Sequence, residues 1–235
     1  MKQACEELKE GVIDALVTAP IDKQSIHSDE FPFKGHTEYL AQFFGVTDNL
    51  MFMVSDTVRV GLVTEHIGVK DIAASVTRER IETKLRIMEN SLRKDFGIAK
   101  PRIAVLGLNP HAGDLGLIGQ EDEQVIKPLI ADQRNKGKLV YGPFAADGFF
   151  ATGNHSKYDA ILAMYHDQGL IPFKLIAFEE GINYTAGLPV VRTSPDHGTG
   201  YSLAGKNMAN ESSLRAAIYR AADIFRNRIE PSTEK

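Results

Sequence analysis

Short apolar runs alternate with helical patterns along the 235 residues of this chain. A short apolar run flanked by polar residues, Gly or Pro is typical of a buried strand. Strands that alternate with amphipathic helices are typical of an α/β fold with a parallel sheet. The runs that predict strands in this way are 12–20, 49–55, 58–66, 103–111 and 161–166.

The segments between these runs have the spacing of amphipathic helices. They are residues 34–45, 71–96, 120–136 and a C-terminal segment that starts near Asn210 or Ser212. In the first helix, Thr37 is the candidate cap and Gly45 the stop. We expect 71–96 to be one long helix, because apolar residues recur on one face. Pro128 lies well inside the third pattern, where it is expected to bend the helix.

The composition argues against several protein classes. The net charge is −4, whereas a nucleic-acid-binding surface needs a basic face. No apolar run approaches the roughly 20 residues of a transmembrane helix, and the N-terminal residues are too charged for a signal peptide. The single Cys5 excludes an internal disulfide, fits a cytoplasmic location and is interpreted as a packed or partly exposed helix residue. We expect neither nucleic acid nor a membrane as a partner.

Three of the predicted strands end in a histidine: His66, His111 and His166. In open α/β folds, ligands bind just beyond the carboxyl ends of the strands, so these imidazoles are expected to converge. Three neutral imidazoles form a suitable set of ligands for a catalytic divalent metal. Asp114 or Asp167 could orient one of the rings or cap the following helix. A lone histidine is more often structural, so the prediction depends on the three together.

A second group is cationic and polar. Residues 34–37 (Lys-Gly-His-Thr) open a predicted helix, where backbone N–H groups attract anions such as phosphate. Lys174, Asn183 and Arg192 follow in loop-like sequence. Arg binds phosphate or carboxylate through a bidentate fork, and Lys binds it as a point charge. The alternative is solvated surface charge.

Two Gly-rich segments remain open to interpretation. Residues 193–210 are rich in Gly and small polar residues and are similar to a loop that surrounds a nucleotide. They do not form the G-x-G-x-x-G strand-to-helix motif of dinucleotide-binding folds. Residues 113–123 contain three Gly at intervals of three, and a flexible lid, a helix entry or a functional role fits them equally.

Together these segments resemble one family, the 4-hydroxythreonine-4-phosphate dehydrogenases of vitamin B6 biosynthesis. The motifs that carry the resemblance are DALVTAPIDK, FKGHTEYLA, GLNPHAGDLGLIGQEDE, YDAILAMYHDQGLIPFK and GLPVVRTSPDHGTGYSLAGK. The resemblance implies an isocitrate/isopropylmalate dehydrogenase-like fold, a two-lobed α/β/α sandwich. It further implies a homodimer with an active site shared between subunits. Because family members have roughly 330 residues, it also implies an N-terminally truncated chain. We expect a middle lobe, on the metal and dimer side, near 35–145 and the remainder of the nucleotide-binding lobe in 1–34 plus 146–235.

The resemblance also implies roles for individual residues. The implied divalent-metal ligands, one of them supplied by the partner subunit, are His66, His111 and His166. The implied substrate contacts are His36, Thr37, Lys174, Asn183 and Arg192. The implied NAD (or NADP) site contains Asp196, His197, Gly198 and Gly200. The catalytic candidates for the general base are Asp147 and Lys174, with Lys23 a weaker one. The metal is expected to be Zn, Co, Mg or Mn.

The activity that this resemblance implies is oxidation of 4-phosphooxy-L-threonine at C3 by NAD, followed by decarboxylation. A bound divalent metal polarises the alcohol, and the phosphate anchors the substrate remotely from the reacting carbon. Three alternatives stay open. The chain could oxidise a 4-phosphorylated sugar acid such as erythronate or threonate 4-phosphate, or it could be an inactive metabolite-binding protein. A metal-dependent hydrolase is the third alternative, although this sequence contains no H-E-x-x-H motif.

Overall fold

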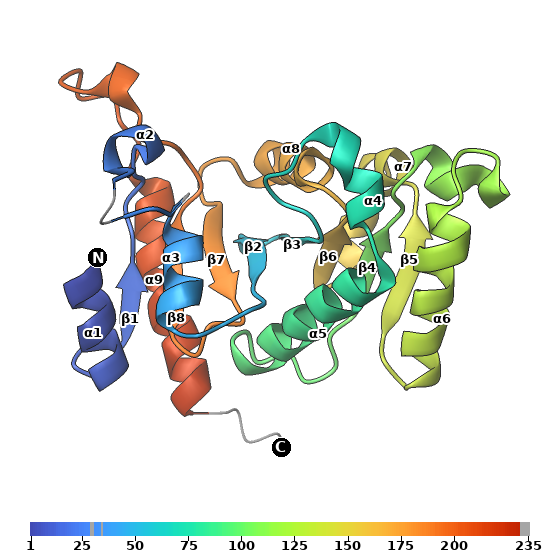
Figure 1. The fold of residues 1–235 in the computed structure, drawn as a ribbon, viewed down its shortest axis with the longest axis horizontal. Helices are drawn as coiled ribbons and strands as arrows, with labels where there is room; N and C mark the ends of the chain where they lie inside the picture. Colours follow the sequence, from blue (N-terminus) through green and yellow to red (C-terminus); the bar gives the residue numbers. More distant parts are fainter. Residues whose placement is uncertain (29–30, 34, 231–235) are drawn as a thin grey trace.

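The structure is a computed structural model that describes residues 1–28, 31–33 and 35–230, without the side chains of 23 and 24. Within that part a mixed eight-stranded sheet runs through the molecule in the order β1-β8-β7-β2-β3-β6-β4-β5 (Figure 1). The strands are β1 (Ala15–Val17), β2 (Leu50–Val54), β3 (Arg59–Leu62), β4 (Ile103–Leu106), β5 (Val140–Phe144), β6 (Ala160–Ala163), β7 (Ile182–Ala186) and β8 (Val191–Pro195).

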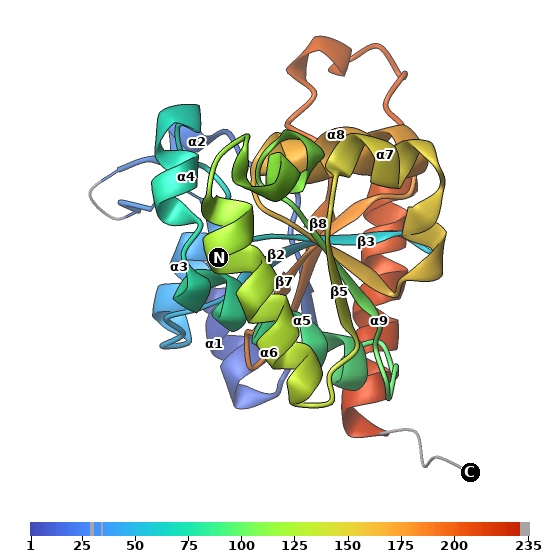
Figure 2. The same cartoon turned by 90° about the vertical axis from the view of Figure 1, so that its right-hand side faces the viewer.

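Helices cover both faces of this sheet (Figures 1 and 2). The α-helices are α1 (Lys2–Glu10), α2 (Lys23–Ile26), α3 (His36–Phe43), α4 (Ile72–Ser75), α5 (Arg78–Lys94), α6 (Lys127–Asn135), α7 (Ala146–Ala151), α8 (His166–Ala177) and α9 (Ser212–Ile229). Shorter turns are η1 (Val69–Asp71), η2 (Pro110–Gly116), the π turn η3 (Asp122–Ile126), η4 (Asn154–Lys157) and η5 (Tyr201–Leu203). The predicted α/β class is confirmed.

Side chains of successive strand residues belong to different cores, as the period of two in a strand requires. Phe52 and Val54 of β2 pack in the core that contains residues of α5, α6 and α9. Met53, between them, packs with Leu170 and Phe173 of α8 on the opposite face. The face that α8 covers is also the face that carries the functional side chains described below.

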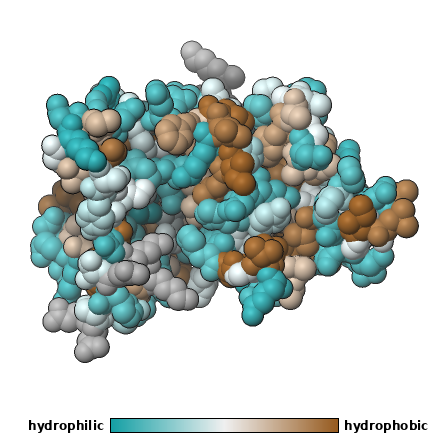
Figure 3. Space-filling model, turned by 90° about the horizontal axis from the view of Figure 1, so that it is seen from above, coloured by the Kyte–Doolittle hydropathy of each residue, from teal (hydrophilic) through white to brown (hydrophobic). Residues whose placement is uncertain are grey.

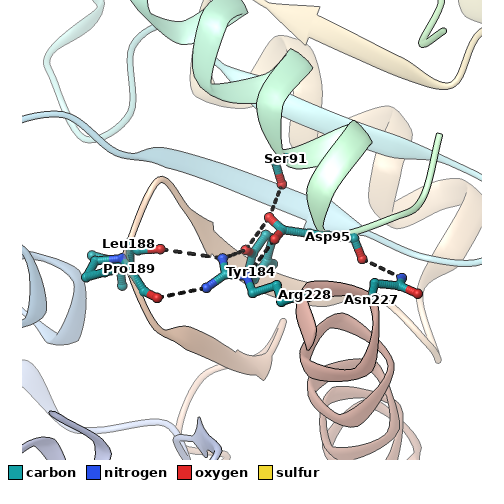
Figure 4. Close-up of polar contacts among 7 residues, drawn as sticks. All are labelled: Ser91, Asp95, Tyr184, Leu188, Pro189, Asn227 and Arg228. Atoms are coloured by element: carbon teal, nitrogen blue, oxygen red, sulfur yellow. Dashed lines mark hydrogen bonds and ion pairs between the residues drawn. The ribbon is translucent and has the colours of Figure 1, made fainter. Parts of the chain in front are cut away.

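A buried polar network joins α5, β7 and α9 (Figure 4). Asp95 accepts hydrogen bonds at 2.6 Å from the hydroxyls of Ser91 and Tyr184, and its carboxylate pairs with Arg228 Nε at 2.7 Å. Arg228 also donates to the carbonyl of Pro189 at 3.1 Å. Desolvation, with Asp95 beside it, raises the pKa of Tyr184 far above its usual range. This network fixes the end of α9 and the β7–β8 connection, away from the functional side chains.

The predicted strands at 49–55 and 58–66 are confirmed as the antiparallel pair β2 and β3, and the C-terminal helix is confirmed as α9. The single helix expected over 71–96 is wrong. Residues 69–75 form η1 and α4, and α5 begins anew after Thr77, whose hydroxyl accepts the backbone N–H of Arg80. A threonine cap of this kind satisfies an orphan N–H and starts a new helix.

One further expectation about helices needs correction. Thr37 lies inside α3 and does not cap it, since the N-cap position is Gly35. The helix expected over 120–136 is confirmed as a helical run over 121–135, in which the π turn η3 continues directly into α6. Pro128 lies in the first turn of α6, just after the π turn, and the expected bend stays a prediction. Cys5 is fully buried in α1, as interpreted.

The lobe boundaries remain a prediction. One sheet crosses both expected lobes, and β6, from the range 146–235, pairs between β3 and β4 of the range 35–145. None of the helices in the described residues is both long and apolar enough to cross a membrane.

Candidate functional site

A cleft of about 930 Å³ opens beyond the ends of several strands. The residues that follow β1, β8 and β3, and the first residue of α8 after β6, line this cleft, and open α/β sheets bind ligands beyond strand ends. β1 is parallel to β8 and β3 is parallel to β6, but the two pairs run in opposite directions, because the antiparallel strands β7 and β2 lie between them. Predicted substrate residues in its lining are His36, Thr37, Lys174, Asn183 and Arg192. Predicted metal or cofactor residues in its lining are His66, His166, Asp196, His197 and Gly198. We call this cavity the central cleft.

Arg192 is a buried cation in this cleft. Its side chain is in β8, only 3% of the residue is exposed, and desolvation lowers the pKa of the guanidinium to about 10. It donates to the hydroxyls of Thr18 and Thr185. In the part of the chain that the structure describes, no carboxylate pairs with it. A buried guanidinium without a counter-ion is a strong site for an anion such as phosphate.

Lys174 provides a second cation in the cleft that Arg192 lines. It comes from α8, and its Nζ lies 3.4 Å from the Asp196 carboxylate and 3.5 Å from the Asp196 carbonyl. Burial raises the pKa of Asp196, while Lys174 acts in the opposite direction. Asp196 therefore restrains Lys174 in this structure, a contact that the sequence interpretation of Asp196 as a cofactor residue did not include.

His66 and His166 lie side by side at the cleft, with ring centroids 5.7 Å apart. The Nδ1 atom of His166 lies 2.7 Å from Asp167 Oδ1. In the neutral tautomer that donates Nδ1–H to Asp167, the other ring nitrogen has its lone pair free for a metal. Two of the three predicted imidazoles are thus brought together, and one of them has the predicted acidic partner.

His111 lies outside the central cleft of its own chain. It is exposed, in η2. Residues 111–115 all have left-handed backbone angles, with φ of 54° at His111 and 42° at Asp114. Strained backbone of this kind is common at functional sites. In the described residues, no group of three His, Cys, Asp or Glu side chains is close enough to hold a metal ion.

Asp122 holds this turn in place, and the sequence interpretation missed it. Its carboxylate is fully buried and accepts the backbone N–H groups of Leu108 at 2.8 Å and Asn109 at 3.0 Å. A Cβ at Gly107 would lie 2.8 Å from Asp122 Oδ1 and from Ala112, so only Gly fits there. The acidic residues at 121–123 are the feature of the sequence that could have indicated this role of Asp122.

The remaining candidate residues lie outside the lining of the central cleft or outside the described part of the chain. Asp147 is exposed in α7 and does not line the central cleft. Gly200 has φ of 63° and starts η5, beyond the cleft lining. Lys34 and the side chain of Lys23 lie outside the described part.

Glu65 and Lys84 also line the cleft, and the sequence analysis did not single them out. Lys84 comes from α5, donates to the carbonyl of Asn49 and lies 3.5 Å from the Glu65 carboxylate. Glu65 directly precedes His66, so this pair braces the loop that carries a predicted metal ligand. A lysine on a helix face carries no sequence signal for such a position.

The family assignment comes from comparison with known sequences. The model of the family described as pyridoxal phosphate biosynthetic protein PdxA matches residues 1–221. The chain belongs to the PdxA family. A curated PdxA relative, the 4-hydroxythreonine-4-phosphate dehydrogenase of Bacteroides thetaiotaomicron, is 56% identical over 229 residues, which is 97% of this chain and 63% of that protein.

Solved structures of similar proteins have the same fold. The 4-hydroxythreonine-4-phosphate dehydrogenase of Klebsiella pneumoniae superposes with a TM-score of 0.83 at 38% identity, over 95% of this chain and 67% of that one. A terephthalate 1,2-cis-dihydrodiol dehydrogenase of Burkholderia xenovorans superposes with a TM-score of 0.71 at 29% identity, over 94% and 70%. The chain thus spans about two thirds of the length of the relatives that it matches.

Proposed function

We propose that this chain oxidises 4-phosphooxy-L-threonine at C3 with NAD and then decarboxylates the keto acid to 3-amino-2-oxopropyl phosphate. Membership of the PdxA family and the name of the relatives support this reaction. The observation that carries it is Arg192, a buried guanidinium without a carboxylate partner among the described residues, in the same cleft as His66 and His166.

The phosphate is the part of the substrate that this cleft is best suited to hold. Arg192 offers N–H donors in a fixed plane, and Lys174 adds a second positive charge. Asn183 of β7 and His36 and Thr37 of α3 line the same cleft. Binding energy from the phosphate then positions C3 for the reaction.

His66 and His166 fit two ligands of a divalent metal, because both are imidazoles at one point of the cleft. Imidazole nitrogens favour Zn or Co over Mg as the bound metal, and Mn is intermediate. When bound, the metal would supply Lewis-acid polarisation of the substrate oxygen. Asp167 would hold the His166 ring in place during the reaction.

We infer that His111 of a second copy completes this ligand set. His111 is exposed and lies outside the cleft of its own chain, and Asp147 is on α7, which packs against η2. One surface of a second copy could therefore supply both. Apolar side chains are exposed near these elements, at Leu115 and Leu117 after His111 and at Leu175 on α8, and Figure 3 shows apolar patches on this side. A homodimer would cover them.

NAD is assigned to the segment that contains Asp196, His197, Gly198 and Gly200. His197 and Gly198 line the central cleft, so a cofactor on this segment would reach the substrate. The nicotinamide would accept the hydride from C3. Asp196 would act through Lys174, because its carboxylate lies beside that ammonium group.

The hydroxyl proton needs an acceptor. Lys174 is the candidate that lies in the cleft, and Asp147 is the candidate that a second copy would bring. In decarboxylation the bond from C2 to the carboxylate breaks, CO2 leaves and C2 takes a proton. The same group could return that proton. We also assign the reaction to the cytoplasm, on the single buried Cys5.

The alternative substrate is a 4-phosphorylated sugar acid. It has the same phosphate and an oxidisable hydroxyl, and Arg192 and Lys174 would bind either molecule. An inactive metabolite-binding protein would use the same anion site without turnover.

Formation of NADH by the chain distinguishes these possibilities. It is measured with 4-phosphooxy-L-threonine, erythronate 4-phosphate and threonate 4-phosphate, each with NAD and a divalent metal. NADH from the first substrate together with release of CO2 supports the proposal. NADH only from a sugar acid assigns the alternative, and binding of all three without NADH assigns a metabolite-binding protein.

A further inference from the structure

Arg192 is held by two threonines that the sheet register places beside it. In the parallel β1–β8 pair, Leu16 is the partner of Arg192, and Thr18 follows two residues later on the same face. In the antiparallel β7–β8 pair, Tyr184 is the partner of Thr193, so Thr185 is next in register to Arg192. Both threonines are buried, with exposures of 7% and 1%.

These threonines take up three of the guanidinium N–H bonds. Thr18 Oγ1 accepts from Nη2 at 2.6 Å and from Nε at 3.2 Å, and Thr185 Oγ1 accepts from Nη1 at 3.1 Å. A guanidinium has five N–H bonds, and no other protein acceptor takes the last two among the residues described. Arg192 lines the central cleft, whereas Thr18 and Thr185 are behind it.

A second buried arginine in the same fold shows the contrast. Arg228 is paired with the Asp95 carboxylate at 2.7 Å, outside the cleft (Figure 4). That carboxylate cancels the positive charge, and the arginine serves packing. The hydroxyls around Arg192 are neutral acceptors, so they restrain the guanidinium plane and leave its charge uncompensated.

We propose that Thr18 and Thr185 are positioning residues: they hold Arg192 with two N–H bonds directed to the central cleft and preserve its charge for a phosphate group. This inference rests on the phosphate site of the proposed function and names residues that determine its geometry. Neither threonine contacts the cleft, so neither is assigned a role in the chemical step.

The test is calorimetric titration of the intact chain with inorganic phosphate. Thr18→Val removes the acceptor of two N–H bonds at nearly constant volume. Loss of hydrogen bonds to a charged group weakens phosphate binding by about tenfold to a hundredfold. Thr18→Ser restores the hydroxyl and binds within about threefold of the original chain. Thr185→Val shows a smaller loss, because it removes one acceptor.

Thr193→Val is the matched control. Thr193 is adjacent in β8 and fully buried, but its hydroxyl donates to the carbonyl of Ala217 on the α9 side. Thr193→Val loses a buried hydrogen bond but removes no partner of Arg192, so we expect phosphate affinity to be unchanged. The Arg192 Nε–H resonance in a nitrogen-15 spectrum shifts in Thr18→Val and stays in Thr193→Val.

Two results overturn the proposal. One is equal phosphate affinity in Thr18→Val, Thr193→Val and the original chain. The other is an equal loss in both variants, since that assigns Thr18 a purely structural role. Thermal unfolding identifies any variant that does not fold. If Thr18→Val is such a variant, the phosphate affinities of Thr185→Val and Thr18→Ser test the proposal in its place. Because the probe is phosphate, absence of NADH in the functional assay leaves this result unaffected.

Discussion

The imidazole rings of His66 and His166 lie 5.7 Å apart, although the two residues are separated by one hundred positions in the chain. They meet because β3 and β6 are parallel neighbours, with Leu62 beside Ala163. Each histidine follows the carboxyl end of its strand within a few residues. This pairing places two candidate metal ligands at one edge of the cleft that contains Arg192.

Loss of the His111 imidazole is predicted to abolish metal-dependent turnover while the chain stays folded, because His111 is exposed and makes no contribution to either main core. His111→Ala is the direct variant. His111→Asn is the better control for the backbone, since Asn tolerates a positive φ. The measurements are bound metal, NADH formation and thermal unfolding. Unchanged metal content and rate in both variants would show that His111 is no ligand.

Arg192→Ala is predicted to weaken binding of the phosphorylated substrate about a hundredfold, with little change in NAD affinity. The guanidinium supplies charge-assisted hydrogen bonds to the phosphate, whereas the segment assigned to NAD begins beyond β8. Arg192→Lys keeps the charge and loses the fork, so an intermediate affinity is expected. Both affinities are measured by titration. Equal losses for the two ligands would make Arg192 structural.

Arg228→Ala is predicted to lower the free energy of unfolding by about 3–5 kcal/mol, because it leaves the Asp95 carboxylate buried without its cation. Urea denaturation measures the change. Arg226→Ala, on the same helix with an exposed ion pair to Asp223, is the matched control and costs less than about 1 kcal/mol. A similar loss of unfolding free energy in both variants would contradict the stabilising role of the buried pair between Arg228 and Asp95.

The pKa of Asp196 is raised, with burial as the main cause. A group with a raised folded-state pKa stabilises the fold below its unfolded pKa, and this contribution is lost as the pH rises through the folded pKa. Asp196→Asn is therefore predicted to raise the melting temperature at pH 7, with a gain that shrinks as the pH falls through the raised folded-state pKa and is gone below the unfolded pKa of about 4. Melting curves of both chains across this range test it. A gain that grows on acidification would contradict the sign.

The sequence was sufficient for the features that depend on local pattern. Strands at 49–55 and 58–66 follow from short apolar runs, and the convergence of His66 and His166 follows from the rule that ligands lie beyond strand ends. Arg192 was identified as an anion-binding candidate, but its burial was not, because a guanidinium in loop-like sequence is usually exposed.

The structural features that the sequence did not predict depend on contacts between distant segments. The left-handed turn at 111–115 is held by Asp122, and Lys174 is restrained by Asp196. Neither pairing follows from spacing along the chain. The break before Thr77 was open to local reasoning, since Thr is a frequent helix cap, but the continuous apolar face concealed it.

The central claim is that one cleft, completed by a second copy, carries the metal-dependent oxidation. His66→Ala and His111→Ala chains, each inactive alone, are refolded together in equal amounts and assayed for NADH with 4-phosphooxy-L-threonine, NAD and metal. Mixed dimers contain one site with both histidines intact, so random assembly predicts roughly a quarter of the original rate. This activity should disappear with a chelator. A mixture as inactive as its components, beside an active original chain, would contradict the shared site.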